Sequence, residues 1–346
     1  MLRGVAALLV VFYHVTGNAK EILHINFLFN FFSFGFAGVD IFFVLSGFII
    51  TYTSVKNIHL IKNIKNFFHR RFVRIFPNYW IITTIFLLIQ ILLPAFYKTH
   101  YTFSLINLLN TYLLLPGHVM VNGVSWTLTF ELFFYIVFSL AFLIPDKKTV
   151  FFAVTIYAVV ITLLPLCGYN YTNNNSWINV VTSPMIIEFF LGLLCAIFIS
   201  HIPKNLSKVL IISGTLFFIM NGMLLNAGYR LMLNDFNRVI FFGVPALFII
   251  AGVLKYEFYN KISTPSILLH LGDASYSLYL LHLPIIVACC KIIFLLKITN
   301  VIWVHIIFLA VIIVVCYASI LYYNIIEKPI ISVLNNIRKV KMAGEI

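Results

Sequence analysis

Residues 2–14 read LRGVAALLVVFYH, and this apolar run between Arg3 and His14 determines our interpretation of the fold. The two polar residues stand eleven positions apart, about three helical turns, so they lie on nearly the same face of a helix. The helical rise separates them by roughly 16 Å, about half the hydrocarbon thickness of a bilayer. With Arg3 at a membrane surface, His14 lies deep inside, where an ionisable residue indicates a functional site. The alternative is a histidine packed against a neighbouring helix and bonded to it.

The composition is that of a multi-span helical membrane protein. The 346 residues are 62% hydrophobic and 10% charged, with a mean hydropathy of +1.04, whereas a soluble domain carries about 25% charged residues. In a soluble protein the net charge of +13 would indicate a nucleic-acid partner. Here Lys and Arg gather in short loops, so we expect membrane lipids, and no nucleic acid, as partners.

The predicted fold is all-α, a polytopic integral membrane protein with about ten transmembrane helices. A cytoplasmic N-terminus places 17 of the 23 Lys and Arg residues on the inner side, which predicts that both termini are cytoplasmic. The predicted spans cover residues 2–17, 38–55, 78–96, 124–144, 149–166, 183–201, 208–225, 237–254, 273–296 and 300–324.

An amphipathic helix is predicted in the cytoplasmic loop over residues 56–80, where Ile and Phe recur at helical spacing among Lys and Arg. Pro77 is expected to end it. Arg71 and Arg74 share a helix face, with Arg70 adjacent, and several guanidiniums at one membrane edge make a natural phosphate clamp. The alternative is a basic segment that anchors the loop to anionic lipid head groups.

Few ionisable side chains lie within the predicted spans. Asp40 opens the second span, and Glu131, Glu188 and His282 lie in later ones. A lone carboxylate in hydrocarbon costs on the order of several kcal/mol unless it is paired or protonated. We therefore expect a carboxylate, from Glu131 or Asp40, to orient His14 so that its other ring nitrogen takes a proton from a hydroxyl. The alternative is a buried pair that holds helices in register, which is the better explanation for Glu188 and His282.

Several motifs together resemble acyltransferase family 3, the membrane O-acyltransferases of bacterial surface glycans. Each motif is weak alone, because apolar patterns recur by chance. Found in one order over nearly the whole chain, they are specific. The motifs are LRGVAALLVVFYH, GVDIFFVLSGFII, RRFVRIFPNYW, SWTLTFELFFY, LGDASYSLYLLHLPI and the terminal IEKP.

The resemblance implies an acyl-CoA donor, usually acetyl-CoA, on the cytoplasmic side. The implied acceptor is a hydroxyl of a cell-surface glycan or lipid-linked saccharide, and no metal is expected. The implied catalytic base is His14, with Glu131 and Asp40 as the other catalytic candidates. The residues assigned to donor binding are Arg3, Arg70, Arg71 and Arg74. The residues assigned to substrate binding are Ser125, Trp126, Tyr276 and His282.

The same resemblance predicts a transmembrane acyltransferase domain over residues 1–329 and a short basic cytoplasmic tail over residues 330–346, in the bacterial inner membrane. No SGNH hydrolase-like domain is expected, and if a relay needs one, a separate periplasmic transferase supplies it. The alternative function is a proton-coupled transporter or flippase, because buried His and Glu also build proton relays. The sequence shows neither the inverted repeat nor the pair of broken helices that favour a transporter.

Overall fold

The computed structural model describes residues 1–54, 64–93, 101–116, 120–140, 147–164, 177–229, 235–260 and 264–343. Within these ranges every regular element is a helix, which confirms the all-α prediction. The longer helices are α1 Leu2–Leu23, α2 Gly38–Ser54, α3 Ile64–Leu92, α5 Trp126–Leu140, α6 Lys147–Leu163, α8 Ile186–Phe198, α9 Leu206–Asn226, α11 Val244–Tyr259, α13 Ser275–Leu295, α14 Val301–Tyr322 and α15 Lys328–Ala343. The shorter elements are η1 Phe27–Ala37, α4 Leu105–Tyr112, η5 Gly123–Ser125, α7 Trp177–Thr182, η7 Ile199–His201, α10 Asp235–Arg238, η9 Val239–Gly243, α12 Ser266–Asp273 and η10 Tyr323–Glu327.

Eight helical stretches of the described residues are long and apolar enough to cross a membrane. They confirm a multi-pass membrane protein. Two further predicted spans coincide with α6 and α8, which contain only 17 and 13 residues. A count of about ten spans therefore stays a prediction.

The expected helix end at Pro77 is wrong, because α3 runs without a break over Ile64–Leu92. Proline removes one backbone hydrogen bond and crowds the carbonyl four residues earlier, but membrane helices tolerate this when neighbouring groups satisfy the backbone. Two residues before the proline, the hydroxyl of Tyr276 on α13 donates to the carbonyl of Ile75 at 2.9 Å, a tertiary contact that ties this part of α3 to α13. The amphipathic segment and the third span thus belong to one helix that begins at residue 64. Residues 56–63 of the predicted loop helix lie outside the described part.

The backbones of α2 and α8 are in direct contact, because each helix contributes a glycine where the two cross. A Cβ on Gly47 would come within 1.9 Å of the carbonyl oxygen of Phe189, and a Cβ on Gly192 within 1.9 Å of the carbonyl oxygen of Val44. Only glycine fits at such distances. Small residues allow this close approach in membranes, where packing replaces the hydrophobic effect as the force between helices.

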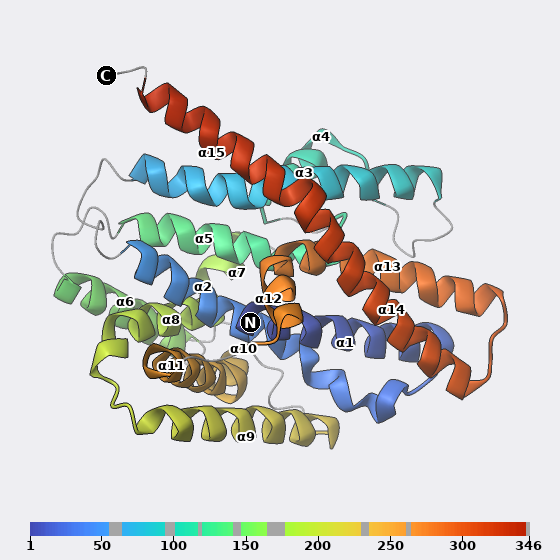
Figure 1. Cartoon of the computed structure of the whole chain (residues 1–346), viewed down its shortest axis with the longest axis horizontal. Coiled ribbons are helices and arrows are strands. Elements are labelled where there is room, and N and C mark those ends of the chain that lie inside the picture. Colours follow the sequence, from blue (N-terminus) through green and yellow to red (C-terminus); the bar gives the residue numbers. More distant parts are fainter. Residues whose placement is uncertain are drawn as a thin grey trace.

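The first helix lies inside the bundle. Figure 1 shows α1 in the middle of the molecule, and η1 and α13 make extensive contact with it. Val11 and Val15 of α1 are buried in one apolar cluster with Leu278 and Ile286 of α13. This packing turns the face that carries the polar residues of α1 toward α13.

The C-terminal part of the chain forms one long helix. α14, the π-helical turn η10 and α15 continue into one another, and Figure 1 shows them running diagonally across the other helices. The predicted boundary between domain and tail at residue 329 lies inside this helix. The division into a domain and a tail stays a prediction.

We expect Gly192→Ala to destabilise the protein by roughly 1–3 kcal/mol, because the new methyl group overpacks the crossing of α2 and α8. Gly17→Ala is the matched control. Nothing lies within 4 Å of that position, and alanine favours a helix by about 1 kcal/mol over glycine, so its stability should hold or rise. The thermal unfolding midpoint in detergent measures both effects, and equal midpoints for the two variants would contradict the close helix contact.

Candidate active site

α1 and α13 run in the same direction, and α13 supplies a hydrogen-bond partner for Arg3 and another for His14. Nε of Arg3 donates to Oγ of Ser275 at 3.1 Å. Eleven residues further along α1, Nδ1 of His14 lies 3.1 Å from Nε2 of His282. One helix–helix contact therefore positions both polar residues on the predicted face of α1.

Hydrogen bonds around the two imidazoles define which nitrogens carry protons when both rings are neutral. Nδ1 of His282 lies 3.0 Å from the carbonyl oxygen of Leu278, and a carbonyl only accepts, so this nitrogen carries the proton. Nε2 of His282 is then an acceptor. Nδ1 of His14 supplies the proton between the rings and shares it with the carbonyl of Val10, which is 3.0 Å away. Nε2 of His14 keeps its lone pair, which is the form that a general base requires.

The expected pairing of His14 with a carboxylate is wrong, because His282 is its partner. Asp40 is completely buried, and Arg238 binds both of its carboxylate oxygens. Nε of Arg238 lies 2.9 and 3.1 Å from the two oxygens, and Nη2 lies 2.7 Å from one of them. This bidentate pair satisfies the carboxylate within the helix bundle and leaves it unavailable to the imidazole.

Glu131 lies on the Arg3 side of the site. Its carboxylate accepts hydrogen bonds from the hydroxyls of Tyr135 and Ser46. Glu131, Ser46 and Arg3 line one cavity of about 40 Å³, far below the roughly 300–1,000 Å³ that is typical of small-molecule sites. In this conformation the cavity is too small for the arm of a coenzyme.

A larger cavity of about 360 Å³ opens at His14. Its volume lies within the range of roughly 300–1,000 Å³ that is typical of small-molecule sites. Aromatic rings and one guanidinium form much of its wall. These side chains are Tyr13, Phe36, Trp126, Tyr279 and Arg238.

The four residues predicted to bind substrate do not share one cavity. Trp126 lines the His14 cavity, Tyr276 lines the Arg3 cavity, and His282 contacts His14 itself. Ser125 is completely buried and donates to the carbonyl of Asn122 at 2.7 Å, a local contact at the turn that begins α5. Among the described residues, no group of three or more His, Cys, Asp or Glu side chains could hold a metal ion.

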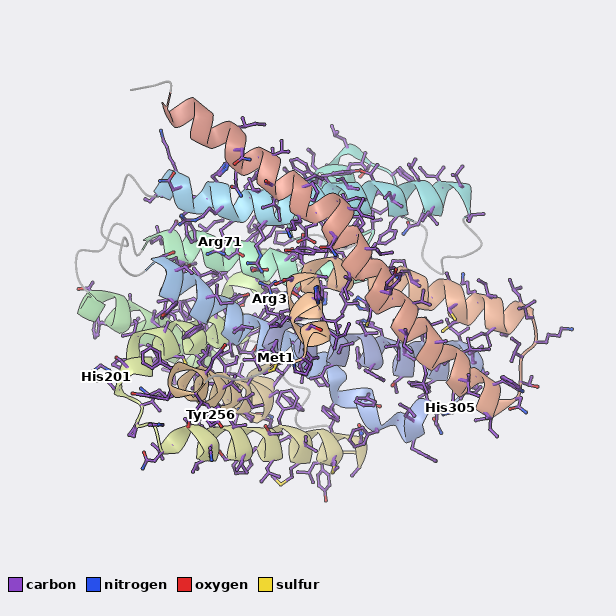
Figure 2. All side chains as sticks on the ribbon, in the orientation of Figure 1. Met1, Arg3, Arg71, His201, Tyr256 and His305 are labelled. Atoms are coloured by element: carbon purple, nitrogen blue, oxygen red, sulfur yellow. The ribbon has the colours of Figure 1, made fainter. Side chains whose placement is uncertain are left out.

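The three arginines near the start of α3 differ in exposure. Arg70 is exposed and Arg74 half-buried, whereas Arg71 is only 9% exposed and packs over the rings of Phe67 and Tyr135. Figure 2 places Arg71 between α3 and α5, whereas Arg3 lies nearer α12. Arg71 lines a separate, mainly apolar cavity of about 310 Å³. The structure therefore does not bring Arg71 into the cavity that Arg3 lines.

Arg238 and Tyr279 are residues of the site that the sequence analysis did not single out. Arg238 directly precedes the apolar run VIFFGVPALFII, and this position indicates a charge at the entry to a span. Tyr279 stands three positions before His282 in SYSLYLLH, a spacing that places both on one helix face.

The fold is that of a multi-pass membrane protein, and His14 lies at the wall of a cavity large enough for a small molecule. Comparison with known families identifies the family of the chain, because the family model of the acyltransferase domain matches residues 1–322. The chain belongs to acyltransferase family 3 and is a membrane O-acyltransferase. This membership favours the enzyme over the transporter considered above.

Curated relatives agree with this assignment. The exopolysaccharide production protein ExoZ of Rhizobium meliloti is 26% identical over 260 residues, which cover 72% of this chain and 76% of ExoZ. The O-acetyltransferase OatA of Staphylococcus aureus is 28% identical over 326 residues, 83% of this chain and 50% of OatA. A putative O-acetyltransferase of the same species, SACOL0978, is 28% identical over 322 residues, 82% of this chain and 50% of that protein. The chain thus spans about half the length of the staphylococcal relatives, and no solved structure matches it.

We expect Asp40→Leu to destabilise the protein by roughly 3–5 kcal/mol, because it leaves the charge of Arg238 without its buried carboxylate. The double variant Asp40→Leu/Arg238→Met removes both charges and should recover most of this loss. Thermal unfolding in detergent completes the double-mutant cycle. Additive effects of the single changes would show that the two side chains are not coupled.

Proposed function

We propose that the protein transfers an acetyl group from acetyl-CoA to a hydroxyl of a cell-surface glycan or lipid-linked saccharide. The observation that carries this proposal is the His14–His282 pair, which leaves Nε2 of His14 unprotonated beside a cavity of about 360 Å³. Relatives named as O-acetyltransferases support the acetyl group. A relative named for exopolysaccharide production supports a saccharide acceptor.

The proposed reaction begins when Nε2 of His14 takes the proton of the acceptor hydroxyl. The oxygen attacks the thioester carbonyl, the new C–O bond forms, and the C–S bond breaks. The proton on His14 then passes to the departing thiolate, which completes the cycle with free CoA. The hydrogen bond from Nδ1 of His14 to His282 keeps the ring in the required tautomer and orientation throughout.

The donor side of this proposal is built around Arg3. It lies roughly 16 Å along α1 from His14, and together with Arg70, Arg71 and Arg74 it supplies the positive charge for the phosphates of CoA. Arg71 packs over the ring of Tyr135 and lines a different cavity from Arg3, so in this arrangement it approaches the phosphates from that cavity. Glu131 faces Arg3 across the small cavity, so we assign it to the donor side and not to the base.

The acceptor side is the cavity at His14. A pyranose ring presents apolar C–H faces and polar hydroxyl edges, and Trp126, Tyr13 and Phe36 offer flat apolar surfaces for such faces. Arg238 offers hydrogen-bond donors while Asp40 holds it in place. Tyr276 belongs to the donor side of this arrangement, and Ser125 supports the turn that carries Trp126.

The proposed setting is the bacterial inner membrane with both termini in the cytoplasm. The support is the concentration of Lys and Arg in alternate short loops. In this orientation Arg3 meets the cytoplasmic pool of acyl-CoA, and the acceptor arrives from the opposite side. If the acetyl group must travel further, a separate periplasmic transferase carries it.

We expect His14→Ala to lose acetylation by about 10²–10⁴-fold while it inserts normally and still binds acetyl-CoA, because only the base is removed. His282→Ala should retain an intermediate rate. His282→Gln should recover part of the loss, because an amide oxygen can accept the hydrogen bond from Nδ1 of His14. Transfer of labelled acetyl groups by membranes, with mass spectrometry of the cell glycan, measures the rates. Wild-type acetylation by His14→Ala would return this histidine to a packing role.

Arg71→Gln/Arg74→Gln tests the arginines as a phosphate clamp. Loss of charge-assisted hydrogen bonds worth about 1.5–3 kcal/mol should raise the dissociation constant of acetyl-CoA by roughly 10- to 100-fold. Lys65→Gln is the control, since Lys65 is an exposed residue of the same helix. Titration of the purified proteins gives the constants. An unchanged value in a well-folded double variant would leave the lipid anchor as the role of these arginines.

A further inference from the structure

Two side chains line both the Arg3 cavity and the His14 cavity, namely Val39 of α2 and Tyr279 of α13. The cavities therefore meet at this point and are separated by these side chains. Tyr279 is the larger of the two and is only 7% exposed. Its side chain therefore forms part of the wall of both cavities.

Contacts at both ends hold Tyr279 in this position. Its hydroxyl donates to the carbonyl of Val124 at 2.7 Å and accepts from the hydroxyl of Thr127 at 2.7 Å, since a phenol has one proton to give. Its ring lies 6.1 Å from the ring of Phe42 and 5.9 Å from that of His282, measured between centroids. The side chain thus connects α13 to the start of α5 and lies against the ring that positions the base.

We propose that Tyr279 is the partition between the two cavities and that it makes acyl transfer prevail over hydrolysis. The second half of this inference rests on the proposed function. In transfer, the acceptor oxygen bonds to the acyl carbon, the C–S bond breaks, and the hydroxyl proton passes through His14 to the thiolate. Water can replace the hydroxyl in the same steps, and the products are then acetate, a proton and free CoA. A closed partition keeps water on the acceptor side away from the thioester until the acceptor fills its cavity.

The separation of the cavities can be measured without catalysis. A cysteine at Ser46, in the Arg3 cavity of a variant without native cysteines, reports access of a membrane-impermeant methanethiosulfonate added to either face of sealed vesicles. With Tyr279 present, we expect labelling from one face only. Tyr279→Ala should allow labelling from both faces, and any other pattern in this variant overturns the partition.

Leu283→Ala is the matched control for this experiment. Leu283 lines the His14 cavity and not the Arg3 cavity, so its truncation enlarges the first without joining it to the second, and labelling should stay on one face. Labelling from both faces in Leu283→Ala would show that any lost volume opens the passage and would overturn the assignment to Tyr279. Tyr279→Leu replaces Tyr279→Ala if the alanine variant fails to fold, with the same expected result.

The effect on specificity is measured with acetyl-CoA alone, as CoA released without an acceptor. We expect about a tenfold rise in Tyr279→Ala over the wild type, no rise in Leu283→Ala, and loss of the release when His14→Ala is added to Tyr279→Ala. An unchanged release in an active Tyr279→Ala variant overturns the role in specificity. A wild type that neither transfers nor hydrolyses the acetyl group refutes the proposed function instead, while the labelling result still decides whether Tyr279 separates the cavities.

Discussion

The packing of α1 against α13 is the contact on which the site depends. Apolar side chains of both helices share one buried cluster, and this packing sets their relative rotation. Arg3 then meets Ser275, and His14 meets His282. Rotation of α1 by one residue, about 100°, would break both contacts at once. A single interface between two helices therefore fixes the charge at one end of the proposed reaction path and the base at the other.

The cost of leaving polar groups unpaired in hydrocarbon explains the partners of Asp40 and Glu131. Asp40 is stabilised by the guanidinium of Arg238, and Glu131 by two hydroxyl groups. Both carboxylates therefore bind other side chains, and the partner of His14 is another imidazole, that of His282. This neutral partner can orient His14 through one hydrogen bond without placing a second charge in the bundle. The ion pair also positions the guanidinium of Arg238, because Asp40 holds it at the wall of the His14 cavity.

Sequence periodicity predicted the helices and the shared face of Arg3 and His14, because both follow from local geometry. Sequence periodicity did not predict the partners of the polar side chains, because these partners come from distant segments of the chain. Arg238 stands 198 positions from Asp40, and His282 stands 268 positions from His14, so no spacing rule connects them. The expected helix end at Pro77 failed for the same reason, since tertiary contacts outweigh the local preference of proline. The cavities could not be predicted, because side chains from several helices form their walls.

The unequal cavities imply that side chains move before a thioester reaches His14, because the Arg3 cavity holds only about 40 Å³. The side chain of Tyr279 can rotate away from the boundary of the two cavities by giving up two hydrogen bonds. Each of these bonds contributes a net free energy of about 0.5–1.5 kcal/mol. Together they favour the closed position by roughly 5- to 150-fold. Binding of an acceptor with a dissociation constant of about 1 mM corresponds to about 4 kcal/mol, which exceeds this difference. The hydroxyl contacts of Tyr279 are therefore strong enough to keep the cavities apart while only the donor is bound and weak enough for the acceptor to displace them.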